Sequence, residues 1–357
     1  MIKLGLIGCG AAMQALHLPA ILQTPDVKIH WIIDSDLHRI KPIADRVKVP
    51  NRDVDYRKVE DVDAVVIGTP HFLHAPMTMH FLEKGVHVLC EKPLALKASD
   101  ALSMVALAEY KKCILAVGVF RRFYHVSGFM KRVIASGWLG PVARINVEEG
   151  GKYDWDLQSR FMMEKEKAGG GVLVDTGSHT LDRLIWLLDV DKAHVQRYAD
   201  NNRGGIETDC ELDLTVTWRN RDIPIHMELS RTRLLNNTFE ISFEHGRLVV
   251  PVNDPSSAFV SDERLSAGFE PDDSNSFYVE AAKGFDFAGK GIVPYFLLQF
   301  QSFCNAINET GPLINSGASV LPCVQIIEYC YQNREELIET WSDVETVNDC
   351  VKIGAKS

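Results

Sequence analysis

Residues 3–13, with the sequence KLGLIGCGAAM, decide the fold of the N-terminal part of the chain. The run Lys3–Ile7 predicts a short buried strand, and Gly8 and Gly10 follow it at once. Two glycines in this place allow a tight turn and let backbone N–H groups approach a pyrophosphate at the start of the next helix. Met13 takes the place of the small third residue of the G-x-G-x-x-G fingerprint. From this stretch alone, a dinucleotide-binding turn and an ordinary glycine turn both remain open.

A carboxylate after the second apolar run favours the dinucleotide interpretation. Asp34 follows Val27–Ile33, roughly where a carboxylate accepts hydrogen bonds from the adenosine ribose. It would repel the 2′-phosphate of NADP, so we expect NAD(H) to be preferred and NADP(H) to be less suitable. The competing interpretation is that Asp34 or Asp36 only caps the following helix.

Strand and helix signals alternate through the first third of the chain. The further apolar runs that we interpret as buried strands are Val27–Ile33, Ala64–Ile67, Val86–Leu89 and Ile114–Val117. Continuous apolar strands imply a sheet covered on both faces, which for β-α-β units means parallel strands and right-handed crossovers. The predicted fold class is therefore α/β, with a doubly wound Rossmann domain over residues 1–122.

The pattern changes after about residue 140 and predicts a substrate-binding and oligomerisation domain over residues 123–357. Residues 210–218 alternate between apolar and polar side chains, as in a strand with one buried face. The same pattern recurs at residues 223–229, 239–243 and 247–250. We expect an α+β domain with a large, mainly antiparallel, one-sided sheet.

Helices and loops complete this second domain. Residues 293–308 and 318–338 have helical patterns, and residues 251–276, rich in Pro, Asp and Ser, predict a long surface excursion. Because the second face of a one-sided sheet can form a subunit interface, we also expect a homo-oligomer.

Composition limits the classes of partner. The 357 residues suggest two domains, and 46% apolar with 24% charged residues is typical of a folded protein. A net charge of −10 argues against nucleic acid or an anionic membrane as the main partner. The eight cysteines form no Cys-x-x-Cys pair, and the N-terminus lacks the features of a signal peptide, so we expect a cytoplasmic protein.

Two further motifs carry residues suited to chemistry. Glu91-Lys92-Pro93 follows the fourth buried strand, and open α/β sheets bind ligands at such carboxyl ends. In the second domain, Gly169-Gly170-Gly171 precedes a helical pattern. On that helix Asp175, His179, Asp182 and Trp186 share an arc of about 60°, opposite an apolar stripe of leucines. A carboxylate and an imidazole four residues apart can serve one reacting group, although in isolation such groups are more often solvated.

The combination resembles the Gfo/Idh/MocA oxidoreductase family over most of the chain. The resemblance implies that Lys92 contacts both a nicotinamide cofactor and the substrate. It also places the segment from Gly68 to His74 beside the nicotinamide, where the family uses no metal, so we predict no metal site at His71 and His74.

The resemblance and the residue chemistry together assign roles. His179 is the expected general acid/base, Lys92 would hold the reacting oxygen, and Asp175 would orient the substrate, although Lys92 and His179 could exchange roles. The predicted cofactor-binding residues are Gly8, Gly10, Ala11, Ala12, Met13, Asp34, Thr69, Pro70, His71, His74, Glu91 and Lys92. The predicted substrate-binding residues are Lys92, Arg122, Lys152, Tyr153, Trp155, Arg160, Asp175 and His179, and Arg231 and Arg233 would suit an anionic group on the substrate.

The expected activity is hydride transfer between nicotinamide and a secondary alcohol or ketone carbon of a sugar, cyclitol or sugar derivative. An NAD-dependent glycoside hydrolase of the same fold and a non-catalytic ligand-binding Rossmann protein are the alternatives. The resemblance implies a dimer or tetramer.

Overall fold

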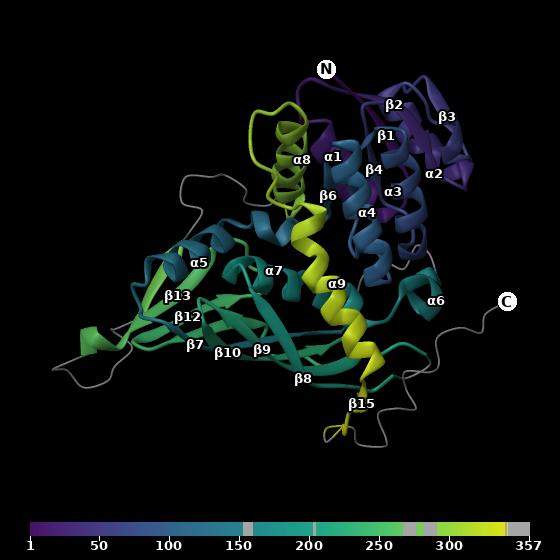
Figure 1. Ribbon diagram of the computed structural model, residues 1–357. Helices are drawn as coiled ribbons and strands as arrows, with labels where there is room; N and C mark the ends of the chain where they lie inside the picture. The colour runs from purple at the N-terminus through teal and green to yellow at the C-terminus, as the bar shows by residue number, and fades with distance from the viewer. Residues whose placement is uncertain (153–159, 203–204, 267–275, 281–290, 340, 342–357) are drawn as a thin grey trace.

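The computed structural model describes residues 1–152, 160–202, 205–266, 276–280, 291–339 and 341 (Figure 1). The N-terminal part forms a compact group of strands and helices at the top of the view, and a broad sheet lies below it. Helix α9, drawn in yellow, runs from one part to the other (Figure 1).

The N-terminal part is built on a six-stranded parallel sheet. Its strands are β1 (Ile2–Ile7), β2 (Val27–Ile33), β3 (Asn51–Asp53), β4 (Ala64–Ile67), β5 (His87–Cys90) and β6 (Leu115–Val117). Their order is β3-β2-β1-β4-β5-β6, and every recorded pairing is parallel. This order belongs to the doubly wound Rossmann fold, so the predicted fold is confirmed. The prediction missed β3, which is too short and polar to give an apolar signal.

Helices cover both faces of this sheet. On one face, α3 (His74–Glu83) and α4 (Ala98–Lys111) pack on β-strand residues such as Val65 and Val88. The other face carries α1 (Leu18–Ile21), α2 (Leu37–Val47) and α8 (Val293–Ile307). Helix α8 comes from the far end of the chain, and its Phe300 and Phe303 share a cluster with Leu4 and Leu6. The C-terminal helices therefore complete the N-terminal sheet.

The second part is a nine-stranded mixed sheet. Its strands are β7 (Val142–Gly150), β8 (Lys192–Asp200), β9 (Asp209–Trp218), β10 (Arg221–Ser230), β11 (Thr238–Phe243), β12 (Gly246–Pro251), β13 (Ser257–Asp262), β14 (Ser276–Glu280) and β15 (Glu335–Glu336). The order is β14-β13-β12-β11-β7-β10-β9-β8-β15. Only the pairs β7–β10 and β8–β15 are parallel among the strands described. The predicted mainly antiparallel sheet is confirmed.

One face of this sheet is covered by α5 (His125–Ser136), α7 (Ser178–Leu188) and α9 (Gly317–Gln332) (Figure 1). Alternate strand residues such as Leu212, Leu214 and Met227 join the same hydrophobic core as α7. The intervening residues, such as Glu211 and Asp213, are half-buried and polar. The alternation in the sequence therefore marks the covered face.

Two expectations about the C-terminal half were wrong. The stretch 251–276 contains β13, whose Ala258 and Val260 are fully buried, because a short inward alternation lies within the Pro, Asp and Ser composition. The helix expected over residues 318–338 ends at Gln332, after which Arg334 pairs with Asp200 and the chain enters β15.

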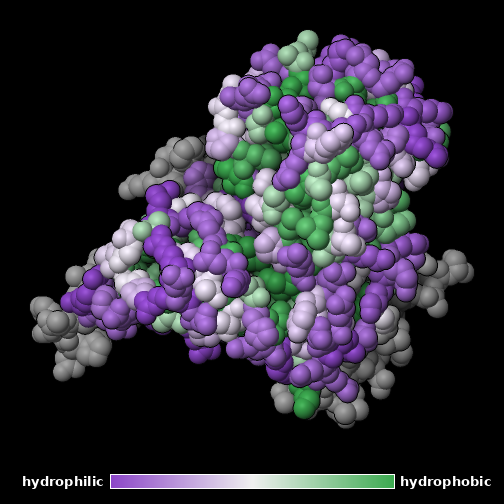
Figure 2. Space-filling view, viewed as in Figure 1, coloured by the Kyte–Doolittle hydropathy of each residue, from purple (hydrophilic) through white to green (hydrophobic). Residues whose placement is uncertain are grey.

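Hydrophilic side chains cover much of the outer ends of both parts in Figure 2, and hydrophobic ones gather in the middle, over α4 and α9. Within the described residues, no helix combines the length and apolar composition that crossing a bilayer requires.

Candidate functional site

The glycine turn after β1 meets the start of the loop after β4. Gly8 has a φ of +89°, and a Cβ added there would lie 2.6 Å from the carbonyl oxygen of Gly68, so both conformation and space require glycine. A Cβ added at Gly10 would meet nothing within 4 Å, which means that open space lies in front of the turn. Strands β1 and β4 are also where the strand order reverses, the usual ligand position in this fold. The turn therefore fits a pyrophosphate.

Met13 lies beneath this turn. It is fully buried at the start of a π-helical turn, Met13–His17, and its side chain packs against Gly68. Because Gly68 has no side chain, the helix can approach the sheet despite the larger residue. Met13 was predicted to bind cofactor, but in the structure it supports the turn from the core, while the half-buried Ala11 and Ala12 begin the helix.

The carboxylate at the end of β2 is tied to the glycine turn. Asp34 accepts hydrogen bonds from the backbone N–H of Cys9 at 2.6 Å and of Asp36 at 2.9 Å, and it is 8% exposed. The cap of α2 is Asp36, whose side chain accepts from the N–H of His38. Asp34 is therefore not the helix cap, and it lies beside the turn.

The segment after β4 joins two other loops through its histidines. The ring nitrogens of His74 lie 2.7 Å from the carbonyl oxygen of Pro93 and 2.9 Å from that of Thr69. His71, just after Pro70, contacts the carbonyl oxygen of Ala168 through Nδ1 at 2.7 Å. Burial, together with the charges of His74 and Lys92, lowers the pKa of His71 to about 3, so its ring is neutral. Both histidines hold the loops around Lys92 in place.

Glu91 lies directly behind the loop that carries Lys92. Its carboxylate is 2.6 Å from His17 Nε2 and accepts a hydrogen bond from the Lys92 N–H at 3.1 Å. Burial acts to raise the pKa of Glu91, but the hydrogen bond from His17 and the charge of Lys92 outweigh it and lower the pKa. Gly118 leaves room for this carboxylate, since a Cβ there would lie 2.6 Å from Oε1. Glu91 therefore anchors the loop as an ion.

The central contact of the site joins the two parts of the chain. Lys92 Nζ lies 2.6 Å from Asp175 Oδ1 and 2.9 Å from the Asp175 carbonyl oxygen. Arg231, at the end of β10, approaches Asp175 Oδ2 at 2.5 Å. Burial alone would raise the pKa of Asp175, but Lys92 and Arg231 hold it well below its usual range. Asp175 is therefore an anion that can accept hydrogen bonds but cannot supply a proton.

His179 lies one turn further along the same helical segment. Its Nδ1 is buried and has no hydrogen-bond partner among the described residues, and its ring packs edge-on against Phe120 at 5.0 Å. Burial, followed by the positive charges of Lys92 and Arg121, lowers its pKa well below the ordinary value. At neutral pH His179 is thus an uncharged imidazole.

Arg122 is not part of this site, contrary to the sequence prediction. Its guanidinium donates to both oxygens of Asp182, at 2.8 and 2.5 Å, and further to the carbonyl oxygens of Ile314 and Ser319. Asp182 was expected on the cleft face but is 1% exposed. Asp182 lies in the regular helix α7, and its side chain faces the buried guanidinium of Arg122 instead of the site.

The other residues predicted to bind substrate follow strands β7 and β10 in the chain. Lys152 is exposed just after β7, Tyr153 and Trp155 lie outside the described residues, and Arg160 begins the 3-10 turn Arg160–Met163. Arg233 pairs with Asp209 and Glu228, so it serves the loop that carries Arg231. Sequence reasoning gave Arg231 little weight because an arginine after a strand is usually solvated.

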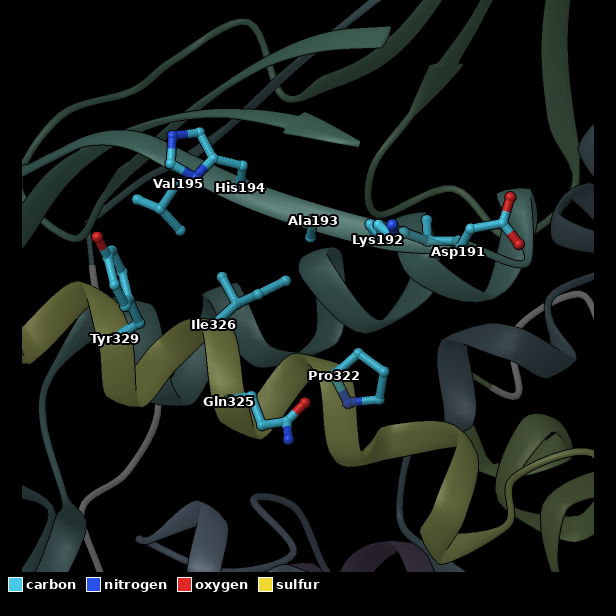
Figure 3. Close-up of a pocket in the computed structure, with 10 residues that line it drawn as sticks. Asp191, Lys192, Ala193, His194, Val195, Pro322, Gln325, Ile326 and Tyr329 are labelled. Atoms are coloured by element: carbon cyan, nitrogen blue, oxygen red, sulfur yellow. The ribbon is translucent and has the colours of Figure 1, made fainter. Parts of the chain in front are cut away.

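A separate cavity of about 350 Å³ opens between the start of β8 and α9 (Figure 3). Residues 190–195 line one side, and Pro322, Ile326 and Tyr329 face them from the helix. Neither Lys92 nor Asp175 lines this cavity, so it is distinct from the site described above.

Comparison with known proteins relates this geometry to a family. The model of the oxidoreductase family with an NAD-binding Rossmann fold (GFO_IDH_MocA) matches residues 2–119, and that of the GFO/IDH/MocA C-terminal domain matches residues 129–249. The chain is 30% identical over 208 residues to the uncharacterized oxidoreductase YdgJ of Escherichia coli, covering 58% of this chain and 60% of YdgJ. It is 28% identical over 192 residues to the scyllo-inositol 2-dehydrogenase (NADP(+)) IolW of Bacillus subtilis, covering 54% and 53%.

Among solved structures, levoglucosan dehydrogenase in complex with NADH and levoglucosan has a TM-score of 0.79 at 20% identity, covering 93% of this chain and 96% of that one. This likeness concerns the fold. Only about half to three fifths of the length of the two curated relatives is matched. The two family models together match more than half of the chain, which belongs to the Gfo/Idh/MocA oxidoreductase family.

Proposed function

We propose that this protein is an NAD(H)-dependent oxidoreductase that exchanges a hydride between bound nicotinamide and a secondary alcohol or ketone carbon of a sugar, cyclitol or sugar derivative. The observation that carries the proposal is the contact of Lys92 with Asp175, with His179 one turn away, at the carboxyl edge of the Rossmann sheet. Family membership and the names of IolW and levoglucosan dehydrogenase support this substrate class.

Three side chains would carry the chemistry on the protein's side. His179, an uncharged imidazole at neutral pH, would accept the hydroxyl proton during oxidation. Lys92 holds the substrate oxygen and stabilises the negative charge that develops on it. Asp175 accepts hydrogen bonds from substrate hydroxyls, a role that suits a permanently ionised carboxylate. Arg231 keeps Asp175 in place from the opposite side.

The cofactor would lie along the carboxyl edge of the six-stranded sheet. Gly8, Gly10 and the helix start after them would hold the pyrophosphate, and Asp34 would hold the adenosine ribose. The Asp34 carboxylate favours NAD(H), although IolW is named for NADP(+). Lys92 would lie where the nicotinamide and the substrate meet.

A homo-oligomer is also part of the proposal. The nine-stranded sheet has one face covered by helices, and the half-buried polar residues of the other face offer a surface for a second copy of the chain. Light scattering at working concentration should give the mass of a dimer or tetramer. A monomeric mass would contradict this part of the proposal.

The test is the absorbance of nicotinamide with NAD and then NADP, against sugars, cyclitols and sugar nucleotides in oxidised and reduced forms. We expect turnover with NAD that falls by about 10² to 10⁴-fold in Lys92→Ala. Lys111→Ala, which removes an exposed lysine at the end of α4, is the matched control and should retain full activity.

Silence across the panel, with NAD binding intact, would reject the dehydrogenase. Cleavage of a glycoside that requires NAD but leaves its redox state unchanged would then identify the hydrolase alternative. Absence of both activities would leave a ligand-binding protein.

A further inference from the structure

The N-terminus of the helical segment that carries Asp175 and His179 is held by a carboxylate from elsewhere in the chain. Glu207, in the connection between β8 and β9, is 2% exposed. Its side chain accepts hydrogen bonds from the backbone N–H of Gly171 at 2.8 Å and of Leu173 at 3.0 Å. Its own carbonyl oxygen accepts from the N–H of Val172 at 3.0 Å. Three backbone donors at this helix start therefore depend on one residue.

Tyr331 completes this arrangement from α9. Its hydroxyl donates to Glu207 Oε1 at 2.7 Å. A side chain at Gly170 would overlap the Tyr331 hydroxyl, and one at Gly171 would overlap the Glu207 carbonyl. The glycines before Asp175 thus have a packing function that differs from contact with a ligand.

The same tyrosine lies where the loop after Lys92 meets the glycine run. A cavity of about 20 Å³ is lined there by Pro93, Leu96, Gly169 and Tyr331, among others. One turn earlier on α9, Glu328 accepts a 3.4 Å hydrogen bond from the N–H of Ala98, at the start of α4. Helix α9 therefore contacts the loop carrying Lys92 and the start of the helix carrying Asp175.

We propose that Glu207 and Tyr331 are positioning residues that set the start of this helix so that Asp175 meets Lys92 and His179 faces the reacting oxygen. The inference rests on the proposed function for its effect on turnover. It goes beyond that function because Glu207 and Tyr331 contact the start of the helix and are not among the residues assigned to substrate or cofactor. The backbone that Glu207 holds leads directly into the π-turn Leu173–Gly177. Within this turn, the carbonyl oxygen of Asp175 accepts a hydrogen bond from Lys92 Nζ. A displacement of Glu207 would therefore also displace the contact between Asp175 and Lys92.

The kinetic test compares Glu207→Gln and Tyr331→Phe with the parent enzyme. The glutamine places an amide N–H against backbone donors, and the phenylalanine removes one hydroxyl at nearly constant volume. We expect kcat to fall by about 10- to 100-fold, as for a misplacement of about 1 Å at the reacting groups, with the KM for NAD within about twofold of the parent value. Arg334→Gln is the matched control, because it breaks a pair with Asp200 just beyond α9 and should leave kcat unchanged.

A second readout does not require turnover. In the parent protein, NMR titration of the histidine rings should place His179, assigned by its loss in His179→Gln, well below its ordinary pKa. Glu207→Gln and Tyr331→Phe should move this midpoint upward, because a displaced helix start admits water to the ring. Arg334→Gln should not move it.

The outcomes separate the two proposals. If the parent protein turns over no substrate but the His179 midpoint rises in both variants, the proposed function fails and the positioning role stands. If turnover is present and both variants lose only thermal stability, with kcat and the His179 midpoint unchanged, Glu207 and Tyr331 are merely structural and the inference is overturned.

Discussion

Replacing Asp182 with asparagine is expected to lower the free energy of unfolding by about 3 to 5 kcal/mol. The side chains of Arg122 and Asp182 are 0% and 2% exposed and share two hydrogen bonds, of 2.8 and 2.5 Å. Asparagine keeps the shape of the carboxylate but removes its charge, so the guanidinium of Arg122 would stay buried without its counter-ion. At roughly 2 to 4 °C per kcal/mol for a domain of this size, Tm should fall by about 6 to 20 °C.

Thermal unfolding followed by circular dichroism measures this loss. Asp189→Asn, at the end of the same helix, is the control, because Asp189 pairs with Lys131 at 76% exposure and such a pair contributes less than about 1 kcal/mol. Combining Arg122→Met with Asp182→Leu should recover most of the lost stability, since both buried charges are removed together.

Kinetics distinguish this structural role from the substrate contact that the sequence suggested for Arg122. At a temperature where the variants are folded, Asp182→Asn and Arg122→Gln should leave the substrate KM unchanged. A loss of stability below about 1 kcal/mol in Asp182→Asn, together with a tenfold higher substrate KM in Arg122→Gln, would refute the reasoning and return Arg122 to the site.

Three further predictions concern the cofactor turn and the buried histidines. Asp34→Ala should raise kcat/KM with NADP relative to NAD, and an unchanged ratio would mean that the carboxylate only ties the turn to β2. Gly8→Ala should lower both Tm and NAD affinity, because an alanine is strained at a φ of +89°. Gly10→Ala should weaken NAD binding at unchanged Tm, since its methyl group enters open space. Equal effects of the two substitutions on Tm would contradict this difference. Stability should fall as pH drops below about 6.5, because the histidines take up protons in the unfolded chain but not in the folded one, at up to about 2.7 kcal/mol per pH unit for two residues. Urea unfolding between pH 7.5 and 5 checks this, and a flat profile would argue against neutral rings at His71 and His179.

The sequence predicted those elements whose signal is local. Continuous apolar runs predicted β1, β2 and β4, and strict alternation predicted β9 and β10. These signals are local because the faces of a strand that are buried determine the polarity of its own residues. The candidate site was predicted from short motifs, such as the four-residue spacing of Asp175 and His179, together with the family resemblance that these motifs carry.

The features of the site that the sequence did not predict depend on contacts between segments that are far apart in the chain. Arg122 and Asp182 pair across 60 residues, and a periodicity analysis of one helix does not show such a partner. Arg231 reaches Asp175 from a strand 56 residues away, and Tyr331 reaches Glu207 across 124 residues. Neither arginine nor tyrosine carries a local sign of such a partner.

The return of α8 to the N-terminal sheet has a consequence for the order of events during synthesis. Phe300 and Phe303, which pack on the strands around Leu4 and Leu6, leave the ribosome about 300 residues after those strands. At about 5 to 20 residues per second, the part of this face that α8 covers stays exposed for about 15 to 60 seconds. A nascent chain stopped near residue 122 would therefore display an apolar surface, and the N-terminal sheet is fully covered only after α8 has been synthesised.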